Sequence, residues 1–339
     1  MSGVVGSRVE CGVDESIFHQ LTTRRTSRVL PQTFLNLGSY LLLSGLGIWL
    51  DHWWAWPCIW VVQGFILSCA LGASHDCAHS VFAKSPVGNH IAGIFWSSTV
   101  LFNYSLYKQF HLEHHRFTMV PGDTEPLGVF KGFWDYLRSL PTTAFFVSFW
   151  IMSVQAMFNR FPHFIKSPKA RREVKIDNLA LMLWAVAIVA ATALWPLKAL
   201  LLYWGPIFFY FPMVFLTSLP EHYGCDEGPD IWTNTRSLTS NFLFRYMFWN
   251  GNFHAEHHIY PTVPSYNLPK LHKLIGSRFK YRETSYVSFH LKLMASLIRQ
   301  SKPRGQTLLS ALKRIEYKMY KAPTPEGSDT RTRDQAIPN

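Results

Sequence analysis

Charged residues are scarce in this chain, at 16% of its 339 residues, whereas soluble proteins average roughly 25%. The deficit is concentrated in four uncharged runs, at residues 29–50, 52–75, 178–197 and 199–220. Each run is close to the ~20 residues that a helix needs to cross a hydrocarbon core of about 30 Å. A helix in a soluble core rarely stays uncharged for so long, so the sequence predicts an integral membrane protein.

Cysteines are also few, and their spacing excludes several kinds of site. The five cysteines are Cys11, Cys58, Cys69, Cys77 and Cys225. None forms a C-x-x-C pair, and no spacing is typical of a disulfide framework, so we interpret them as ordinary membrane and cytosolic thiols. No cleavable signal peptide is expected, because the first apolar run starts only near residue 29 and serves as an anchor.

The charge that is present is strongly basic, with a formal net charge of +12. Lys and Arg gather beside the apolar runs, at Arg24, Arg25 and Arg28 and again between Arg160 and Lys175. This distribution follows the positive-inside pattern of membrane proteins. It therefore indicates a membrane surface as the partner of the basic residues and disfavours nucleic acid.

Fifteen histidines are present, and eight of them fall into three clusters. The clusters are His75-Asp-Cys-Ala-His79, His111-Leu-Glu-His114-His115 and His254-Ala-Glu-His257-His258. Residues three and four positions apart share one face of a helix, about 5–6 Å apart. Each cluster therefore presents its imidazoles in one direction, as metal binding requires. A single pair of this kind is often structural, but three clusters together predict a metal site.

The remaining histidines are more isolated in the sequence. We interpret His19, His52, His90, His163 and His290 as structural, and His272 as a packing or cap residue.

The positions of the clusters also predict the membrane topology. If all three clusters serve one metal site, they lie on the same side of the bilayer. Two further uncharged runs, 85–107 and 139–159, then cannot cross and should lie in the interface. We expect an all-α integral membrane protein with four transmembrane helices in two hairpins, interfacial helices and a histidine-rich cap. Nearly every Lys and Arg falls on the cap side, so the cap and both termini are expected to be cytosolic.

The number of histidines favours two metal ions. Imidazole suits zinc, copper, iron and nickel, but a single zinc ion takes about four ligands. Eight histidines are too many for one ion and suit two ions with four or five nitrogens each. His222, just after the fourth crossing on the same side, is the natural ninth ligand.

Three carboxylates, Asp76, Glu113 and Glu256, lie inside the clusters. Carboxylates often hold the outer N–H of a ligating imidazole. They could equally be solvated or paired with Arg116, and the sequence leaves both alternatives open.

The three clusters, in this order and with these spacings, resemble the three histidine boxes of the membrane fatty acid desaturase superfamily. The stretch from Asn234-Thr235-Arg236 through Trp249-Asn250 to HAEHHIYPTVPSYNLPKLH also resembles its C-terminal signature, and the resemblance covers roughly residues 30–280. It implies a four-crossing, mushroom-shaped helical fold, two iron ions in a cytosolic cap, O2 as co-substrate and a lipid-like substrate that enters from the bilayer.

One position departs from the pattern of some acyl-CoA members. These place an asparagine four residues before the additional histidine, which is His222 in this chain. This chain has Ser218 there, which weakens any transfer of acyl-CoA specificity. The short first box also points towards acyl-lipid or other non-CoA members.

The resemblance implies oxidation of an unactivated C–H bond, and we favour desaturation of a fatty acyl chain. The first alternative is a hydroxylase or ketolase that acts on a lipid, a carotenoid or a specialised metabolite at the same di-iron site. The second is a non-enzymatic haem protein that transfers electrons. Segments 93–107 and 203–215 are candidate walls of a substrate tunnel, although their aromatic residues could equally anchor the chain in the membrane.

Desaturation also requires two electrons. The sequence contains no haem-binding HPGG stretch and no cysteine set for an iron–sulfur cluster. An external donor is therefore expected, either a ferredoxin or a small b-type cytochrome with its reductase, attracted by the basic face.

Four segments are expected along the chain. They are an N-terminal cytosolic segment at 1–28, the membrane domain with its di-iron cap at 29–280, basic amphipathic helices at 281–322 and a disordered tail at 323–339.

Overall fold

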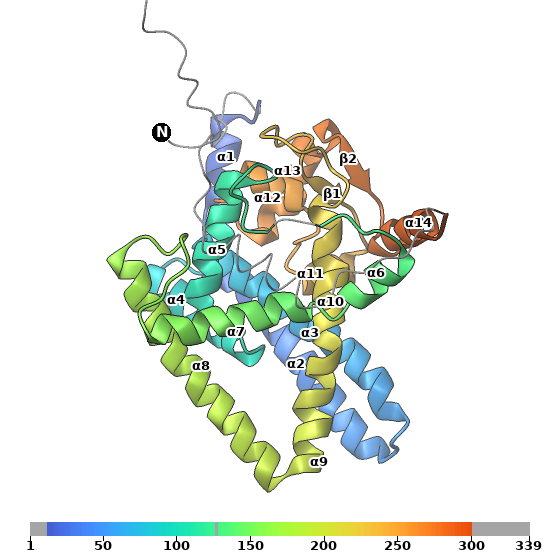
Figure 1. Ribbon diagram of the computed structural model, residues 1–339. Coiled ribbons are helices and arrows are strands. Elements are labelled where there is room, and N and C mark those ends of the chain that lie inside the picture. The colour runs from blue at the N-terminus through green and yellow to red at the C-terminus, as the bar shows by residue number, and fades with distance from the viewer. Residues whose placement is uncertain (1–11, 126–127, 300–339) are drawn as a thin grey trace, which may run out of the picture.

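The computed structural model describes residues 12–125 and 128–299, and these are mainly helical (Figure 1). The helices that form the membrane region and its interface are α2 (Thr26–Leu50), α3 (Ala55–Ala78), α4 (Pro86–Thr99), α6 (Phe133–Ser139), α7 (Thr143–Met157), α8 (Pro168–Leu194), α9 (Pro196–Ala199) and α10 (Gly205–His222). A π-helical turn, Leu200–Trp204, joins α9 to α10.

The cap is built from shorter elements. Its helices are α1 (Glu15–Thr22), α5 (Tyr104–Phe117), α11 (Phe242–Met247), α12 (His254–Ile259), α13 (Leu268–Ile275) and α14 (Tyr286–Arg299), with 3-10 turns at Ser265–Asn267 and Gly276–Arg278. Two short parallel strands, β1 (Arg236–Leu238) and β2 (Tyr281–Glu283), form the sheet of the described residues.

Two long hairpins carry the membrane crossings, as the sequence predicts. One consists of α2 and α3, and the other of α8 followed by the continuous stretch Pro196–His222. Both project from the same side of the cap in Figure 1. α2 ends at Asp51, whose left-handed backbone (φ 50°) returns its N–H to the carbonyl of Gly47. The turns at the far ends of both hairpins are short, so little of the described chain lies beyond the bilayer.

The second hairpin starts earlier than its uncharged run indicates. α8 begins at Pro168, and Ser167 caps it by accepting the N–H of Ala170 at 3.1 Å. Proline at the first helical position and serine before it are favourable helix starts. The first turns of α8 therefore contain the basic residues between Lys169 and Lys175. An uncharged run marks only the part of a helix inside the hydrocarbon.

By length and composition, the stretch Phe133–Met157 is a fifth candidate for a crossing. It is not one continuous helix, because the backbone of Thr142 is left-handed (φ 48°) between α6 and α7. In Figure 1, α7 runs across the hairpins rather than along them. α4 has only 14 residues, which span about 21 Å of a ~30 Å core. The predicted all-α membrane protein is therefore confirmed, and α4 and the broken stretch α6–α7 are compatible with the predicted interfacial helices. The number of four crossings stays a prediction, because five stretches of the described chain are long and apolar enough to cross.

The two hairpins are joined by the close packing of α3 against α10. Gly64 permits this approach, since a Cβ at that position would lie 2.6 Å from Cβ of Phe209. The π-helical turn leaves carbonyls that need other partners inside a bilayer. Tyr40 donates to the carbonyl of Leu202 at 2.7 Å, and Trp60 donates to that of Leu201 at 2.9 Å. Both hairpins thus hold one another in a fixed register.

A buried polar group fixes α4 and α5 against α8. Asp177 of α8 accepts the backbone N–H of Ser105 at 2.9 Å and lies 3.1 Å from Nε2 of His90. Asn103 caps α5 by accepting the N–H of Leu106, and its amide donates to Asn178 at 2.7 Å. α5 carries the second histidine box, and its start is therefore tied to the membrane helices.

The predicted outer segments are only partly covered by the described residues. α14 lies within 281–322, and it buries Phe289 and Leu297 while Lys292 and Arg299 are exposed, as in an amphipathic helix. Residues 1–11, 300–322 and the tail 323–339 lie outside the described residues. The predicted division of the chain into segments stays a prediction.

Candidate metal centre

Four elements bring the clustered histidines and His222 to one place in the cap. His75 lies in the last turn of α3, and His79 follows its end. The second box occupies the C-terminal half of α5, and the third box forms α12. His222 is the last residue of α10. The ends of two transmembrane helices therefore meet two cap helices.

The nine histidines separate into two groups. The first contains His75, His79, His111, His115 and His257, and the second contains His114, His222, His254 and His258. Within each group, one nitrogen from every ring lies within 4.8 Å of all the others. Every histidine that the sequence predicts as a ligand belongs to one of these groups.

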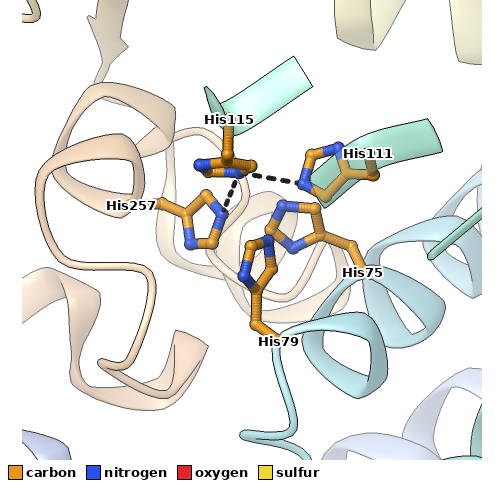
Figure 2. A group of neighbouring side chains, drawn as sticks. All are labelled: His75, His79, His111, His115 and His257. Carbon is orange, nitrogen blue, oxygen red and sulfur yellow. Dashed lines mark hydrogen bonds between the residues drawn. The ribbon is translucent and has the colours of Figure 1, made fainter. Parts of the chain in front are cut away.

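In the first group, five rings from α3, α5 and α12 converge on a common point (Figure 2). Nε2 of His115 is 3.0 Å from Nε2 of His111 and 3.0 Å from Nε2 of His257. Nε2 of His75 and Nε2 of His79 are buried and have no hydrogen-bond partner among the described residues. Two nitrogens at right angles on one ion, with bonds of ~2.1 Å, would lie about 3.0 Å apart.

The second group is entirely buried and has the same spacing. Nε2 of His222 is 3.2 Å from Nε2 of His114 and 3.1 Å from Nε2 of His254, which in turn is 2.9 Å from Nε2 of His258. His111 and His114 are neighbours on α5 but belong to different groups. The two groups are therefore adjacent, as a centre with two metal ions requires.

The hydrogen bonds made by the Nδ1 atoms determine which nitrogen of each ring carries the proton and which carries the lone pair. Nδ1 of His222 lies 3.0 Å from the backbone carbonyl of Asn234, which can only accept, so Nδ1 carries the proton. Nδ1 of His114 donates to Asp123 at 2.7 Å, and Nδ1 of His111 donates to Glu125 at 3.1 Å. These contacts turn the Nε2 lone pairs towards one another, as in metal sites with hydrogen-bonded ligands.

Lone pairs about 3 Å apart repel one another unless a cation lies between them. Burial lowers the pKa of His115 and of His257 well below the usual range, and neighbouring imidazoles lower it further. Neutral imidazole is the form that binds metal. The donor set therefore fits two metal ions of the kinds that imidazole binds, which are zinc, copper, iron and nickel.

Two of the carboxylates inside the boxes contact groups other than the clustered histidines. Glu113 pairs with Arg116 at 2.5 Å and with Lys166 at 2.6 Å. Glu256 accepts from Ser237 at 2.7 Å and contacts Nδ1 of His272 at 2.5 Å. Residues one or two positions apart on a helix do not face each other, so both carboxylates point away from the histidines of their own box.

Asp76 is closer to a clustered histidine than Glu113 and Glu256 are, but it does not hold that histidine by a hydrogen bond. Its Oδ1 lies 3.8 Å from Nδ1 of His75, beyond hydrogen-bond distance, and its buried Oδ2 has no partner among the described residues.

The carboxylates that do hold the rings were missed by the sequence analysis. Asp123 and Glu125 lie on the loop after α5, and Asp123 also accepts the backbone N–H of Met119 and of Glu125, each at 2.8 Å. Glu221 has its carboxylate 3.5 Å from Nδ1 of His254. The available signal was the acidic pair in Asp123-Thr124-Glu125, just past the second box. Without the loop conformation, that pair cannot be assigned to a ring.

A cavity of about 840 Å³ leads to the histidines. It reaches His75, His111 and His257 of the first group and His222 and His254 of the second. Its lining is rich in aromatic side chains, including Phe102, Phe110, Phe145, Phe149 and Trp249. Phe102 of segment 93–107 and Phe215 of segment 203–215 both line the cavity. Each of the two predicted wall segments therefore contributes to the lining. A mostly apolar pocket of this size suits a small lipid-like molecule.

Comparison with known proteins agrees with this geometry. Residues 51–290 match the family model for fatty acid desaturase. The chain is 26% identical over 310 residues to a chloroplastic omega-3 fatty acid desaturase of Ricinus communis, which covers 82% of this chain and 66% of the relative.

Two relatives from Arabidopsis thaliana are similar to a comparable degree. One is an acyl-lipid omega-3 desaturase (cytochrome b5) of the endoplasmic reticulum, 25% identical over 75% of this chain and 74% of the relative. The other is a chloroplastic, temperature-sensitive sn-2 acyl-lipid omega-3 desaturase (ferredoxin), 24% identical over 77% of this chain and 66% of the relative. The chain thus spans about two thirds to three quarters of the length of these relatives.

The assignment of the histidines as ligands can be tested with one variant in each group. His257→Ala removes a nitrogen from the first group, and His114→Ala removes one from the second. Each variant should lose the ion of its own group, so iron bound to the purified protein should fall to about half, and activity should be abolished. Elemental analysis of the detergent-solubilised chain measures the iron, with His52→Gln at the far turn as the control. Full iron occupancy in both alanine variants would contradict the assignment.

Asp123 provides a separate test of the outer hydrogen bonds. Asp123→Asn keeps the shape of the side chain but removes the charge that orients His114, so iron affinity should fall roughly 10- to 100-fold. Competition with a chelator measures that affinity. Asp226→Asn is the matched control, because the half-buried Asp226 pairs with Lys280 and Tyr281 instead. Equal affinities in the two variants would show that Asp123 does not support the centre.

Proposed function

The chain belongs to the fatty acid desaturase family, and from that premise we propose that it is a membrane di-iron oxidoreductase that uses O2 to desaturate a fatty acyl chain. The observation that carries this proposal is the juxtaposition of two buried histidine groups with an aromatic-lined cavity that reaches both of them. Nitrogen ligands alone would indicate only a metal site. The cavity adds a place for a long apolar substrate beside that site.

The nine histidines would hold two iron ions, and iron in this setting supplies the redox chemistry with O2. Asp123 and Glu125 keep the rings of His114 and His111 in the orientation that binding requires. Their charges also offset part of the positive charge that two cations would bring into a buried site. Because these hydrogen bonds already orient the rings, the histidines need little rearrangement when metal binds.

The cavity would position the carbon atoms that react. His75 and His257 lie at its inner surface, and Tyr107 is stacked on His111 with ring centroids 5.7 Å apart. Phe102 and Phe149 stack on each other with centroids 4.3 Å apart. These rigid rings exclude water and restrict an acyl chain to few conformations, so that one C–H bond is presented to the centre.

An external electron carrier would complete the reaction. The printed names of two relatives specify cytochrome b5 in one case and ferredoxin in the other. With a formal net charge of +12, this chain would attract an acidic carrier of either kind. We place the cap, both termini and the carrier on the cytosolic side, because the basic residues gather there.

A hydroxylase or ketolase is the second candidate, because the same ligands can support insertion of oxygen into a C–H bond. The two reactions differ in how the substrate is positioned rather than in which residues bind metal. The haem alternative has less support. A haem binds one histidine on each side of its plane, whereas each group here holds four or five rings that each offer a nitrogen within 4.8 Å of all the others.

Mass spectrometry of lipids from a host that expresses the chain distinguishes these functions. We expect a lipid species lighter by two hydrogens, which should be absent from cells that express the His257→Ala variant. A species heavier by one oxygen would instead support the hydroxylase. Identical lipid profiles, with iron-loaded protein and a supplied electron donor, would contradict desaturation of the host lipids.

A further inference from the structure

The cavity lining at the junction of α6 and α7 differs in chemistry from the aromatic part of the lining. There the lining includes the polar residues Arg138, Ser139, Thr142 and Thr143. Among the lining residues, Val129, Arg138 and Thr143 are exposed, whereas most of the aromatic residues and most of the histidines are buried, so we take this junction as the mouth of the cavity.

The mouth lies at the boundary between the membrane region and the cap. α6 and α7 run across the hairpins at this level in Figure 1. Trp134 of α6 is 63% exposed, and exposed tryptophans are enriched at the level of the lipid headgroups. A lipid could therefore leave its polar end at this level while its acyl chain enters the cavity.

Arg138 is the cation at the mouth, and its guanidinium has no acidic partner among the described residues. Asp135 lies one turn earlier and also lines the cavity, but its Oδ2 accepts the backbone N–H of Lys131 at 3.1 Å. The planar guanidinium presents paired N–H donors that match the oxygens of a phosphate or a carboxylate. Its chemistry therefore fits an oxyanion at the polar end of the substrate.

The position of Arg138 is fixed by buried contacts of α6. The hydroxyl of Tyr136 donates to Nδ1 of His290 at 2.9 Å, and Nε2 of that ring donates to the carbonyl of Leu216 at 2.8 Å. Tyr136 also packs in an apolar cluster with Phe215 and Phe289. Because these contacts tie α6 to α10 and α14, the mouth is held at a constant place relative to the histidines of the cap.

We propose that Arg138 binds an oxyanion at the polar end of the acyl substrate, and that this oxyanion is the phosphate of a membrane phospholipid. This inference rests on the proposed function and names its substrate class. A free fatty acid would offer a carboxylate to the same guanidinium, whereas a diacylglycerol has no oxyanion. Binding at the mouth would set how far the acyl chain reaches along the cavity.

Kinetics of the iron-loaded full chain with a supplied electron donor test this proposal. The substrates are oleoyl phosphatidylcholine, oleic acid and dioleoylglycerol, each in the same neutral detergent. Arg138→Ala should raise KM for the phospholipid roughly 3- to 10-fold, with kcat little changed, and should leave KM for dioleoylglycerol unaltered. Arg138→Lys should restore part of the loss, since it keeps the charge without the paired donors. Arg282→Ala, at an exposed position outside the cavity lining, is the control.

Binding of the same three lipids, measured by quenching of tryptophan fluorescence with brominated acyl chains, provides a second readout that needs no turnover. Loss of affinity in Arg138→Ala for the phospholipid alone supports the phosphate, and loss for oleic acid alone overturns it in favour of a carboxylate. Equal affinities and KM values in wild type and Arg138→Ala for all three lipids overturn the site. If binding depends on Arg138 but no lipid is desaturated, the proposed function fails while the oxyanion site stands.

Discussion

The mutual repulsion of buried imidazole lone pairs is the constraint on which the rest of the structure depends. Nine rings are held in two adjacent groups, with one nitrogen from every ring within 4.8 Å of the others in its group and several Nε2 atoms only about 3 Å from a neighbour. The protein must hold these rings together against that repulsion or rely on cations to remove it. It does the first through hydrogen bonds that the outer nitrogens donate to Asp123, to Glu125 and to the carbonyl of Asn234.

The membrane helices serve this centre by delivering its ligands at a fixed height. His75 and His222 lie at the ends of α3 and α10, the two helices that pack most closely through Gly64. The start of α5 is tied to α8 through Asp177. Because backbone groups inside a bilayer must be paired within the protein, these helices are rigid supports, and a shift of one relative to another would separate ligands of the same group. The same rigidity gives the cavity its walls.

The sequence was sufficient for the elements that depend on periodicity and composition. The spacing of the three boxes predicted which histidines would share a helix face, and the requirement for a common side of the membrane predicted that residues 85–107 and 139–159 would not cross. It was less informative where a loop determines the contact. Asp123 reaches His114 because the chain turns back after α5, which no local pattern encodes. For Glu113 the pairing with Arg116, one of the two alternatives that the sequence left open, is present. Helix geometry is consistent with this, because a residue two positions from a histidine of the same box does not face it.

The central claim is that the two histidine groups bind two iron ions through nitrogen. X-ray absorption at the iron edge, measured on the purified full-length protein together with its iron content, tests this most directly. The account predicts two irons per chain, with nitrogen or oxygen neighbours at about 2.1 Å and the outer-shell scattering of several imidazole rings. One iron per chain, or sulfur among the nearest neighbours, would contradict it.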